Sequence, residues 1–368
     1  MRVLAFDLGN VVFNFDYHLA LEKIKTKLGS SPQRVIDALF YENFAQDFEK
    51  GLVSGYDFYQ KFKKEFNCSL DYEEFKDIWC KIFFPNQEVI SFIKILRLIY
   101  PIYLISNINE LHFNYLYQSF GEIFSLFDGS VFSFQVKSVK PEERIYEELV
   151  KLAGVSKDRI IYIDDRQDLV DEAQLLGFSA IRFTTFSKLI DQLQEKGVFV
   201  PTFYEGEVLL KLKDKLSVTK NAVIVGLGNP LRGDDGIGSI LAGDLKGKLL
   251  LRVLDVGLSL ENYLTKLMEY KFILIVDSAH FSSSSRFELF SLHQLGSLSL
   301  DFTHALPLDF LMKCLKKDSL TDILILGIKP YNLKVGEELS IEVRKVREGL
   351  GNFFIRNFSL KKHASKLK

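Results

Sequence analysis

Four polar groups in the first half of the sequence occur in an order that suits phosphoryl transfer. Carboxylates follow two apolar segments, a hydroxyl follows a third, and a lysine precedes a predicted helix: Asp7 and Asp164-Asp165, Ser106, and Lys140. The carboxyl ends of parallel strands converge on one crevice, so we expect these groups to meet there. A carboxylate can attack phosphorus, a hydroxyl and a lysine can bind phosphoryl oxygens, and an acidic pair can hold Mg²⁺. Taken singly, each residue could instead cap a strand or carry a surface charge, but the four in this order favour a site.

A glycine-rich run in the second half, residues 226–238, also presents carboxylates. It follows the apolar stretch 222–225 and precedes a predicted helix. A dinucleotide-binding turn requires glycine where Leu231 stands, and a P-loop requires Lys and Ser or Thr where Asp234 and Asp235 stand. Because two carboxylates would repel phosphate, the loop suits a cation instead.

Two later residues of the second half occupy comparable positions. Asp277 ends an apolar segment, and His304 directly precedes a predicted helix. Each has a structural interpretation: Asp235 could stabilise a helix N-terminus, Asp277 could cap a turn, and His304 could be a polar helix start. His293 competes with His304 as the histidine of interest, whereas His280 follows Asp277 in a serine-containing loop. We find no Ser-His-Asp or Cys-His set in this half that would supply a nucleophile.

The segments around these residues predict an α/β protein with two domains. Apolar strands alternate with helical patterns over residues 1–200, which is typical of a parallel sheet with helices on both faces. Helix formers without strand signals predict a helical cap over about 15–84. A polar, lysine-rich stretch over 201–220 predicts a linker, and a second α/β series occupies 221–360.

The composition excludes several classes of protein. A length of 368 residues suits two domains, and the net charge of −1 gives no field that favours nucleic acid. The three cysteines form no CxxC pair, which argues against a disulfide scaffold and indicates a reducing cytoplasm. No apolar run approaches the roughly 20 residues of a membrane helix, and the N-terminal apolar stretch is too short for a signal peptide. We therefore predict a cytoplasmic protein without membrane insertion.

The four groups of the first half resemble the haloacid dehalogenase superfamily, in its subgroup IA phosphatase-like branch with a helical cap. The runs at 6–12 and 48–51 share in the resemblance, which covers about residues 1–195. It implies a Rossmannoid parallel sheet and an Mg²⁺-dependent phosphatase that forms an aspartyl phosphate. The implied roles are those of nucleophile, phosphate ligands and Mg²⁺ ligands: Asp7; Ser106 and Lys140; and Asp164, Asp165 and the carbonyl of Gly9.

One position departs from that pattern. Phosphatases of the superfamily usually carry a second aspartate two residues after the nucleophile, where it acts as general acid and base, and this chain has Gly9 there. The close subgroup with a DLGNV run shares the departure, so phosphatase activity stays compatible with the sequence. The proton donor is left unassigned, and a slower or repurposed domain is the alternative.

The glycine-rich run, the strand ending in Asp277 and the segment around His304 resemble the hydrogenase maturation endopeptidases, in the formate-hydrogenlyase-type branch. The resemblance spans about residues 221–355. It implies a smaller α/β/α domain that removes the C-terminal extension of the NiFe hydrogenase large subunit. The metal contacts implied are Asp235, Asp277 and His304, and they would sense nickel held by the precursor. Carboxylate and imidazole ligands suit Ni²⁺ and also Zn²⁺.

We therefore predict a bifunctional hydrolase. Its second half would be a nickel-dependent endopeptidase acting on a NiFe hydrogenase large-subunit precursor, and its first half a phosphatase. The alternative is a phosphatase for a small phosphorylated metabolite with an accessory second half. A third interpretation is a non-catalytic maturation factor that binds the precursor and checks its metal.

Overall fold

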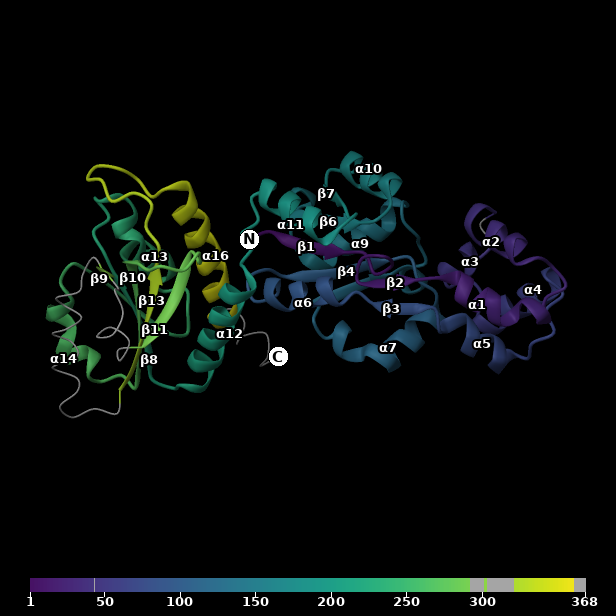
Figure 1. Cartoon of the computed structure of the whole chain (residues 1–368), viewed down its shortest axis with the longest axis horizontal. Helices are drawn as coiled ribbons and strands as arrows, with labels where there is room; N and C mark the ends of the chain where they lie inside the picture. Colours follow the sequence, from purple (N-terminus) through teal and green to yellow (C-terminus); the bar gives the residue numbers. More distant parts are fainter. Residues whose placement is uncertain (43, 292–300, 303–320, 361–368) are drawn as a thin grey trace. The chain divides into compact units, whose positions relative to one another are not determined.

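The computed structural model describes the chain apart from residues 43, 292–300, 303–320 and 361–368. The chain divides into two compact units, Met1–Glu195 and Lys196–Lys368. Each unit is built on its own mainly parallel sheet with helices packed beside it (Figure 1). The predicted α/β fold class with two sheet-based domains is therefore confirmed. No described helix has the length and apolarity needed to cross a lipid bilayer.

The sheet of the first unit has five parallel strands in the order β5-β4-β1-β6-β7. Every residue of β1, β4 and β6 is buried, because helices cover both faces of the sheet. Polar side chains therefore follow these strands at their carboxyl ends. The strands are β1 (Val3–Phe6), β4 (Ile102–Ser106), β5 (Gly129–Phe132), β6 (Ile160–Asp164) and β7 (Ser179–Arg182).

Helices connect these strands, and two of them have side-chain caps at their N-termini. Asn86 caps α6 and Asn109 caps α7 through side-chain oxygens that accept backbone N–H groups. Gly154, with φ of 66°, ends α9 in the left-handed conformation that favours glycine. The helices are α6 (Gln87–Leu96), α7 (Glu110–Phe124), α8 (Ser133–Val136), α9 (Glu143–Ala153), α10 (Gln167–Leu175) and α11 (Phe186–Glu195).

The stretch predicted as a helical cap contains five helices. An antiparallel ribbon of β2 (Phe13–Phe15) and β3 (Phe83–Pro85) leads into and out of them. Aromatic side chains fill the core of the cap, including the buried Phe58, Phe62 and Trp79. The helices are α1 (Tyr17–Ile24), α2 (Pro32–Tyr41), α3 (Gln46–Glu49), α4 (Gly55–Glu65) and α5 (Tyr72–Cys80).

The sheet of the second unit follows the order β11-β13-β10-β8-β9, with β12 beside β10. The central strands are parallel, whereas β11 and β12 pair antiparallel with their neighbours. The strands are β8 (Ala222–Leu227), β9 (Arg252–Gly257), β10 (Phe272–His280), β11 (Phe287–Ser291), β12 (Asp301–Phe302) and β13 (Asp322–Ile328). The helices are α12 (Phe203–Val218), α13 (Ile237–Leu245), α14 (Leu264–Leu267) and α16 (Ile341–Phe358).

The stretch 201–220, which we predicted as a linker, forms helix α12 over most of its length. Thr202 and Glu205 close a capping box at the start of the helix. Glu205 is fully buried and pairs with Arg286, which directly precedes β11, so the helix packs within the second unit. The lysines that suggested a linker are spaced along a helix whose other side buries Val208 and Leu212. The high content of lysine suggested a linker, although this helix also buries apolar side chains.

Candidate active sites

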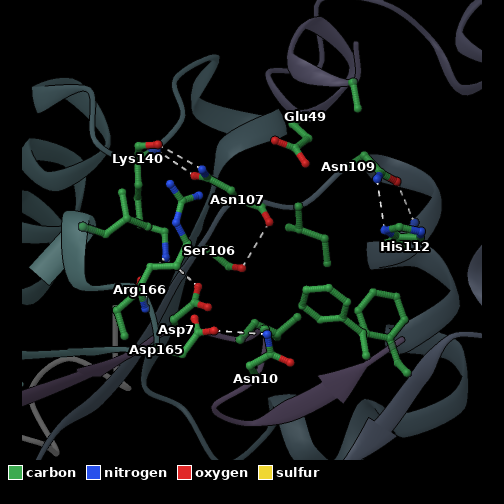
Figure 2. A pocket seen from close by; sticks show the side chains of 18 of the residues that line it. Asp7, Asn10, Glu49, Ser106, Asn107, Asn109, His112, Lys140, Asp165 and Arg166 are labelled. Atoms are coloured by element: carbon green, nitrogen blue, oxygen red, sulfur yellow. Dashed lines mark hydrogen bonds and ion pairs between the residues drawn. The ribbon is translucent and has the colours of Figure 1, made fainter. Parts of the chain in front are cut away.

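The first unit brings four of its predicted polar residues together at the carboxyl edge of its sheet. Asp7 follows β1, Asp164 ends β6, and Lys140 lies in the loop before α9. Lys140 Nζ is 2.6 Å from Asp7 Oδ1 and 2.6 Å from Asp164 Oδ2. Carboxylate oxygens of Asp7, Asp164 and Asp165 all lie within 4.8 Å of one another. Neighbouring parallel strands thus bring three carboxylates together, and the ammonium group of Lys140 contacts two of them. Figure 2 shows Lys140 beside Asp7 and Asp165.

Asparagine side chains fix the loops that carry these charges. Asn107 Oδ1 accepts a hydrogen bond from Lys140 N at 2.7 Å, and Asn107 Nδ2 donates to Lys140 O at 3.1 Å. Asn10 Nδ2 donates to Asp165 Oδ2 at 3.1 Å. Ser106 is buried at the end of β4, beside Asn107. The Lys140 backbone is therefore held next to Ser106 by two bonds to one side chain (Figure 2).

Burial dominates the electrostatics of this cluster. Desolvation raises the pKa of Asp7 to about 7, against the attraction of Lys140 and with the repulsion of Asp164. Desolvation also acts on Asp164, but the charge and hydrogen bond of Lys140 hold the pKa of that carboxyl below its usual range. Burial would lower the pKa of Lys140, yet Asp164 and Asp7 raise it, so the ammonium stays charged. Three carboxylates thus face one built-in positive charge.

A cavity of about 510 Å³ opens over this cluster. Its wall combines the carboxyl edge of the sheet with residues of the cap ribbon, the cap helices and the start of α7. The polar lining residues beyond the cluster are Asn10, Glu49, Asn107, Asn109, His112 and Arg166. The aromatic lining residues are Phe15, Tyr17 and Phe83. The cavity therefore has room for a small polar molecule above the charged cluster (Figure 2).

The second unit buries two carboxylates at the ends of neighbouring parallel strands. Asp235 follows β8 in the turn before α13, and Asp277 lies near the end of β10; both are almost inaccessible to solvent. Ser278 contacts both of them: its Oγ donates to Asp235 Oδ1 at 3.5 Å, and its N–H donates to Asp277 Oδ1 at 2.8 Å. Asn229 N also donates to Asp235 Oδ2 at 3.3 Å. One serine therefore joins the two predicted metal contacts.

Asp234 and Asp235 are neighbours in sequence but have different surroundings. Asp234 Oδ1 accepts a hydrogen bond from Ser340 N at 2.7 Å, and its Oδ2 accepts bonds from Tyr331 N and Asn332 N at 2.8 Å each. Asp234 thus braces the loop between β13 and α16, whereas Asp235 faces Ser278. Of the two carboxylates, Asp235 is the one that contacts Ser278, the residue after Asp277.

The glycines of this run permit close packing of backbones. A Cβ on Gly238 would lie 2.1 Å from Val276 O, and one on Gly226 would lie 2.1 Å from Gly238 O. Gly228 has φ of 129°, and a Cβ there would lie 2.0 Å from Asp235 O. The glycines therefore let α13 approach β8 and β10 closely, and so they bring Asp235 to the strand that carries Asp277.

Comparison with known proteins separates the two halves of the chain. The family model of haloacid dehalogenase-like hydrolases matches residues 1–173. D-ribitol-5-phosphate phosphatase from Bacteroides thetaiotaomicron is 25% identical over 189 residues, which are 50% of this chain and 91% of that protein. A putative hydrogenase maturation protease from Methanocaldococcus jannaschii is 32% identical over 132 residues, which are 32% of this chain and 78% of that protein. The second half of the chain belongs to the hydrogenase maturation proteases, and the first half resembles the haloacid dehalogenase-like hydrolases.

Solved structures similar to the chain divide in the same way. A dehalogenase-family enzyme from Bacteroides thetaiotaomicron covers 52% of this chain and 98% of its own, with 22% identity and a TM-score of 0.47. The NiFe hydrogenase maturation protease HycI from Thermococcus kodakarensis covers 40% of this chain and 97% of its own, with 23% identity and a TM-score of 0.33. The recognition of both families from sequence motifs is confirmed by the sequence comparisons.

The donor set of the dehalogenase-like unit fits Mg²⁺. Its three clustered carboxylates, Asp7, Asp164 and Asp165, offer the hard oxygen ligands that this cation prefers. A bound cation would also favour the ionised form of Asp7, whose pKa burial raises. Gly9, predicted to contribute a carbonyl, lines the same cavity.

The maturation protease unit is described in part at its predicted site. Asp235 and Asp277 are brought together, whereas His304 and its competitor His293 lie outside the described residues. The short strand β12 pairs Phe302 with Ala279, two residues beyond Asp277. Two carboxylates of the predicted set of three are therefore placed.

Sequence reasoning missed several residues that shape the two sites. In the dehalogenase-like unit these are Asn10, Asn107, Glu49 and Arg166, and in the protease unit Ser278. Asn10, Asn107 and Ser278 each stand within three positions of a predicted site residue, so proximity in sequence could have found them. Glu49 is distant in sequence from the predicted site residues, and its only signal was that it stands in the run 48–51 of the predicted cap.

Proposed function

We propose that the chain is a bifunctional hydrolase. Its maturation protease unit removes the C-terminal extension of a NiFe hydrogenase large-subunit precursor that carries nickel, and its dehalogenase-like unit hydrolyses the phosphomonoester of a small metabolite. The names of the two relatives support these activities, since one is a phosphatase and the other a putative hydrogenase maturation protease. The observation that carries the proposal is the presence of a separate carboxylate site in each unit.

In the dehalogenase-like unit, Asp7 acts as the nucleophile toward phosphorus, and Lys140 and Ser106 bind the phosphoryl oxygens. The ion pair of Lys140 with Asp7 supports this assignment, because it holds the ammonium where phosphoryl oxygens approach the nucleophile. Bound Mg²⁺, with Asp7, Asp164 and Asp165 as ligands, supplies further charge neutralisation at phosphorus. The Asn107 clamp keeps Lys140 in position while the substrate binds.

The preferred substrate class of this unit is a phosphorylated polyol or sugar. The cavity of about 510 Å³ is of the size that suits such a molecule. The guanidinium of Arg166 lines the cavity and has donors suited to hydroxyl groups. The similar phosphatase is named for D-ribitol 5-phosphate, which belongs to this class.

In the maturation protease unit, Asp235 and Asp277 contact the nickel that the precursor brings. Both carboxylates are buried beside Ser278, where a borderline cation delivered with its own ligands gains two oxygen donors. His304 is the third contact of the proposal. Nickel here belongs to the substrate, so recognition of the metal and recognition of the precursor are one event.

A cleavage assay with intact mass detection tests the endopeptidase. Purified chain is incubated with a large-subunit precursor, with and without nickel. Loss of a C-terminal peptide from the nickel-loaded precursor alone is expected, and Asp235→Asn is expected to abolish it. Glu269→Gln is the matched control, because Glu269 is exposed in the same unit. Binding of the precursor without any change in its mass would favour the non-catalytic maturation factor instead.

Phosphate release tests the other unit independently. Mg²⁺-dependent release from a panel of polyol and sugar phosphates is expected, and Asp7→Asn should abolish it because the nucleophile is lost. Absence of release across the panel would contradict the phosphatase proposal and leave the endopeptidase proposal intact.

A further inference from the structure

The dehalogenase-like unit has no acidic side chain at the position where its relatives usually carry the proton donor. A Cβ on Gly9 would lie 2.9 Å from Cε1 of Phe15 and 3.6 Å from Oδ2 of Asp7. The Phe15 ring therefore occupies the space that an aspartate at position 9 would need. An alkoxide leaving group must still be protonated, so the donor has to come from elsewhere in the cavity.

Glu49 is an acidic residue that enters this cavity from the cap. It is the last residue of α3, and Figure 2 shows its side chain on the opposite side of the pocket from Asp7 and Asp165. Among the described residues, no side chain or backbone group forms a hydrogen bond or ion pair with its carboxyl group. The carboxyl group is therefore available to a substrate.

The ionisation of Glu49 suits proton transfer near neutral pH. Desolvation by burial raises the pKa of Glu49 to about 7, while the positive charges of Arg166 and Lys140 act in the opposite direction. A general acid works best when its pKa lies near the operating pH. The group can therefore hold a proton before the reaction and give it up during it.

Other titratable residues of the cavity wall are less suited to the role. His112 has both ring nitrogens engaged, Nδ1 with Asn109 Nδ2 at 3.0 Å and Nε2 with Trp79 O at 3.1 Å. Burial lowers the pKa of His112 to about 4 and raises that of Tyr17 far above its usual value. Asp165 belongs to the metal-binding cluster. Glu49 is the carboxyl group left over.

The backbone around Glu49 is attached to the catalytic core. The buried Ser133 Oγ donates to Glu49 O at 2.6 Å and accepts a hydrogen bond from Ile108 N at 2.9 Å, two residues after Ser106. Lys50 forms an ion pair with Glu142, two residues after Lys140. Gly51 O accepts a hydrogen bond from Lys137. Three successive residues of the cap thus contact the loops that carry Ser106 and Lys140.

Gly51 is the residue that allows this attachment. Its φ is 62°, and a Cβ there would lie 2.4 Å from Phe134 O. The run Phe48-Glu-Lys-Gly51 therefore requires glycine to seat the end of α3 against α8. Glu49 is held in place by this seat, as a catalytic group must be.

We infer that Glu49 is the general acid, and then the general base, of the dehalogenase-like site. This inference rests on the proposed phosphatase function. In the first step the Asp7 carboxylate bonds to phosphorus, the bond from phosphorus to the ester oxygen breaks, and the proton of Glu49 passes to that oxygen to release the alcohol. In the second step Glu49 takes a proton from a water molecule while the oxygen of that water bonds to phosphorus. The bond between phosphorus and Asp7 breaks, which releases inorganic phosphate.

Two leaving groups distinguish this role from substrate binding. The full chain and its Glu49→Gln variant are compared on the polyol phosphate that the wild type hydrolyses fastest, and on p-nitrophenyl phosphate, whose phenolate leaves without a proton. The variant should lose about 10²–10⁴-fold in kcat on the alkyl ester and clearly less on the aryl ester. Asp47→Asn, on the exposed side of the same helix, is the matched control and should leave both rates unchanged.

The remaining outcomes separate this inference from the function beneath it. An equal loss on both esters, or a rise in KM with kcat unchanged, would overturn the role of Glu49 and leave the phosphatase in place. Wild-type activity on p-nitrophenyl phosphate with none on any alkyl ester would also overturn it, because the chain would then lack a donor for an alkoxide. Activity on neither ester would remove the phosphatase proposal itself. Trp79 fluorescence reports whether each variant is folded, since it is the single tryptophan of the chain.

Discussion

The two units place acidic side chains at the same kind of sheet edge but surround them differently. In the dehalogenase-like unit a buried ammonium, Lys140, contacts two of the carboxylates directly. In the maturation protease unit the described contacts of Asp235 and Asp277 include backbone N–H groups and the hydroxyl of Ser278. A buried ammonium is thus part of the first arrangement, and the described contacts of the second include a hydroxyl and backbone amides.

That difference matches the charge that each proposed substrate brings. A phosphomonoester is an anion, so its site needs a fixed cation beside the nucleophile. A nickel-bearing precursor brings the cation itself, so its site needs carboxylate oxygens as donors to the metal. The same position at the end of a parallel strand can therefore serve either chemistry, depending on the neighbouring loop.

Removing the built-in cation should have the largest effect. Lys140→Met leaves Asp7 and Asp164 buried without their ion pair, so the free energy of unfolding of the first unit should fall by roughly 3–5 kcal/mol. Urea unfolding followed by Trp79 fluorescence measures this, because the single tryptophan lies in that unit. Lys151→Met, at an exposed ion pair, should change stability little. A Lys140→Met variant as stable as the wild type would contradict the role of Lys140 as the cation that compensates these carboxylates.

The adjacent aspartates of the second unit should separate structure from function. Asp234→Ala leaves three backbone N–H groups without their acceptor, which should destabilise the loop 331–340 by about 2–4 kcal/mol. Amide hydrogen exchange over 331–340 measures the loss. Asp235→Asn should preserve that protection while abolishing precursor cleavage. Equal loss of amide protection over 331–340 in both variants would contradict the distinction between Asp234 and Asp235.

His112 should make the stability of the first unit more sensitive to acid. Burial lowers the pKa of His112 to about 4 in the folded state, from 6.5. The imidazole binds more protons in the unfolded chain between these values, so its contribution to stability is lost as the pH falls from about 6.5 toward 4, by up to about 3 kcal/mol. The raised pKa values of Asp7 and Glu49 act in the opposite direction over the same window, so the wild type is compared with His112→Gln at each pH. Fluorescence of Trp79, which stacks on His112, reports the unfolding. The stability difference between the two proteins should change across this window, and a constant difference would contradict the assignment.

Glycine packing in the second unit offers the smallest expected change. Gly238→Ala forces a Cβ against Val276 O and Leu227 O, so the free energy of unfolding should fall by about 1–3 kcal/mol. Gly243→Ala, in the same helix with no atom within 4 Å, should be neutral or stabilise by about 0.5–1 kcal/mol. Thermal unfolding of the two variants makes the comparison. Equal effects at both glycines would show that close approach of α13 is not needed.

Local sequence patterns were sufficient for the strands and for the residues that end them. The apolar runs before Asp7, Asp164 and Asp277 predicted buried parallel strands, because a strand covered on both faces must be apolar throughout. The order of polar residues after those strands was likewise enough to indicate two families. The same reasoning failed over 201–220, where lysines between the buried positions concealed helix α12.

The sequence by itself determined which residues stand at strand ends, since burial dictates composition along each strand. Only the tertiary structure decided which of Asp234 and Asp235 contacts Ser278 beside Asp277, because backbone groups about 100 residues away in sequence form hydrogen bonds with Asp234. The same holds for Glu49, which reaches the cavity because α3 is seated on the loop before α9. Contacts between segments that are distant in sequence depend on how the elements pack against one another. The periodicity of apolar residues identifies the buried face of an element but not the element that packs against it.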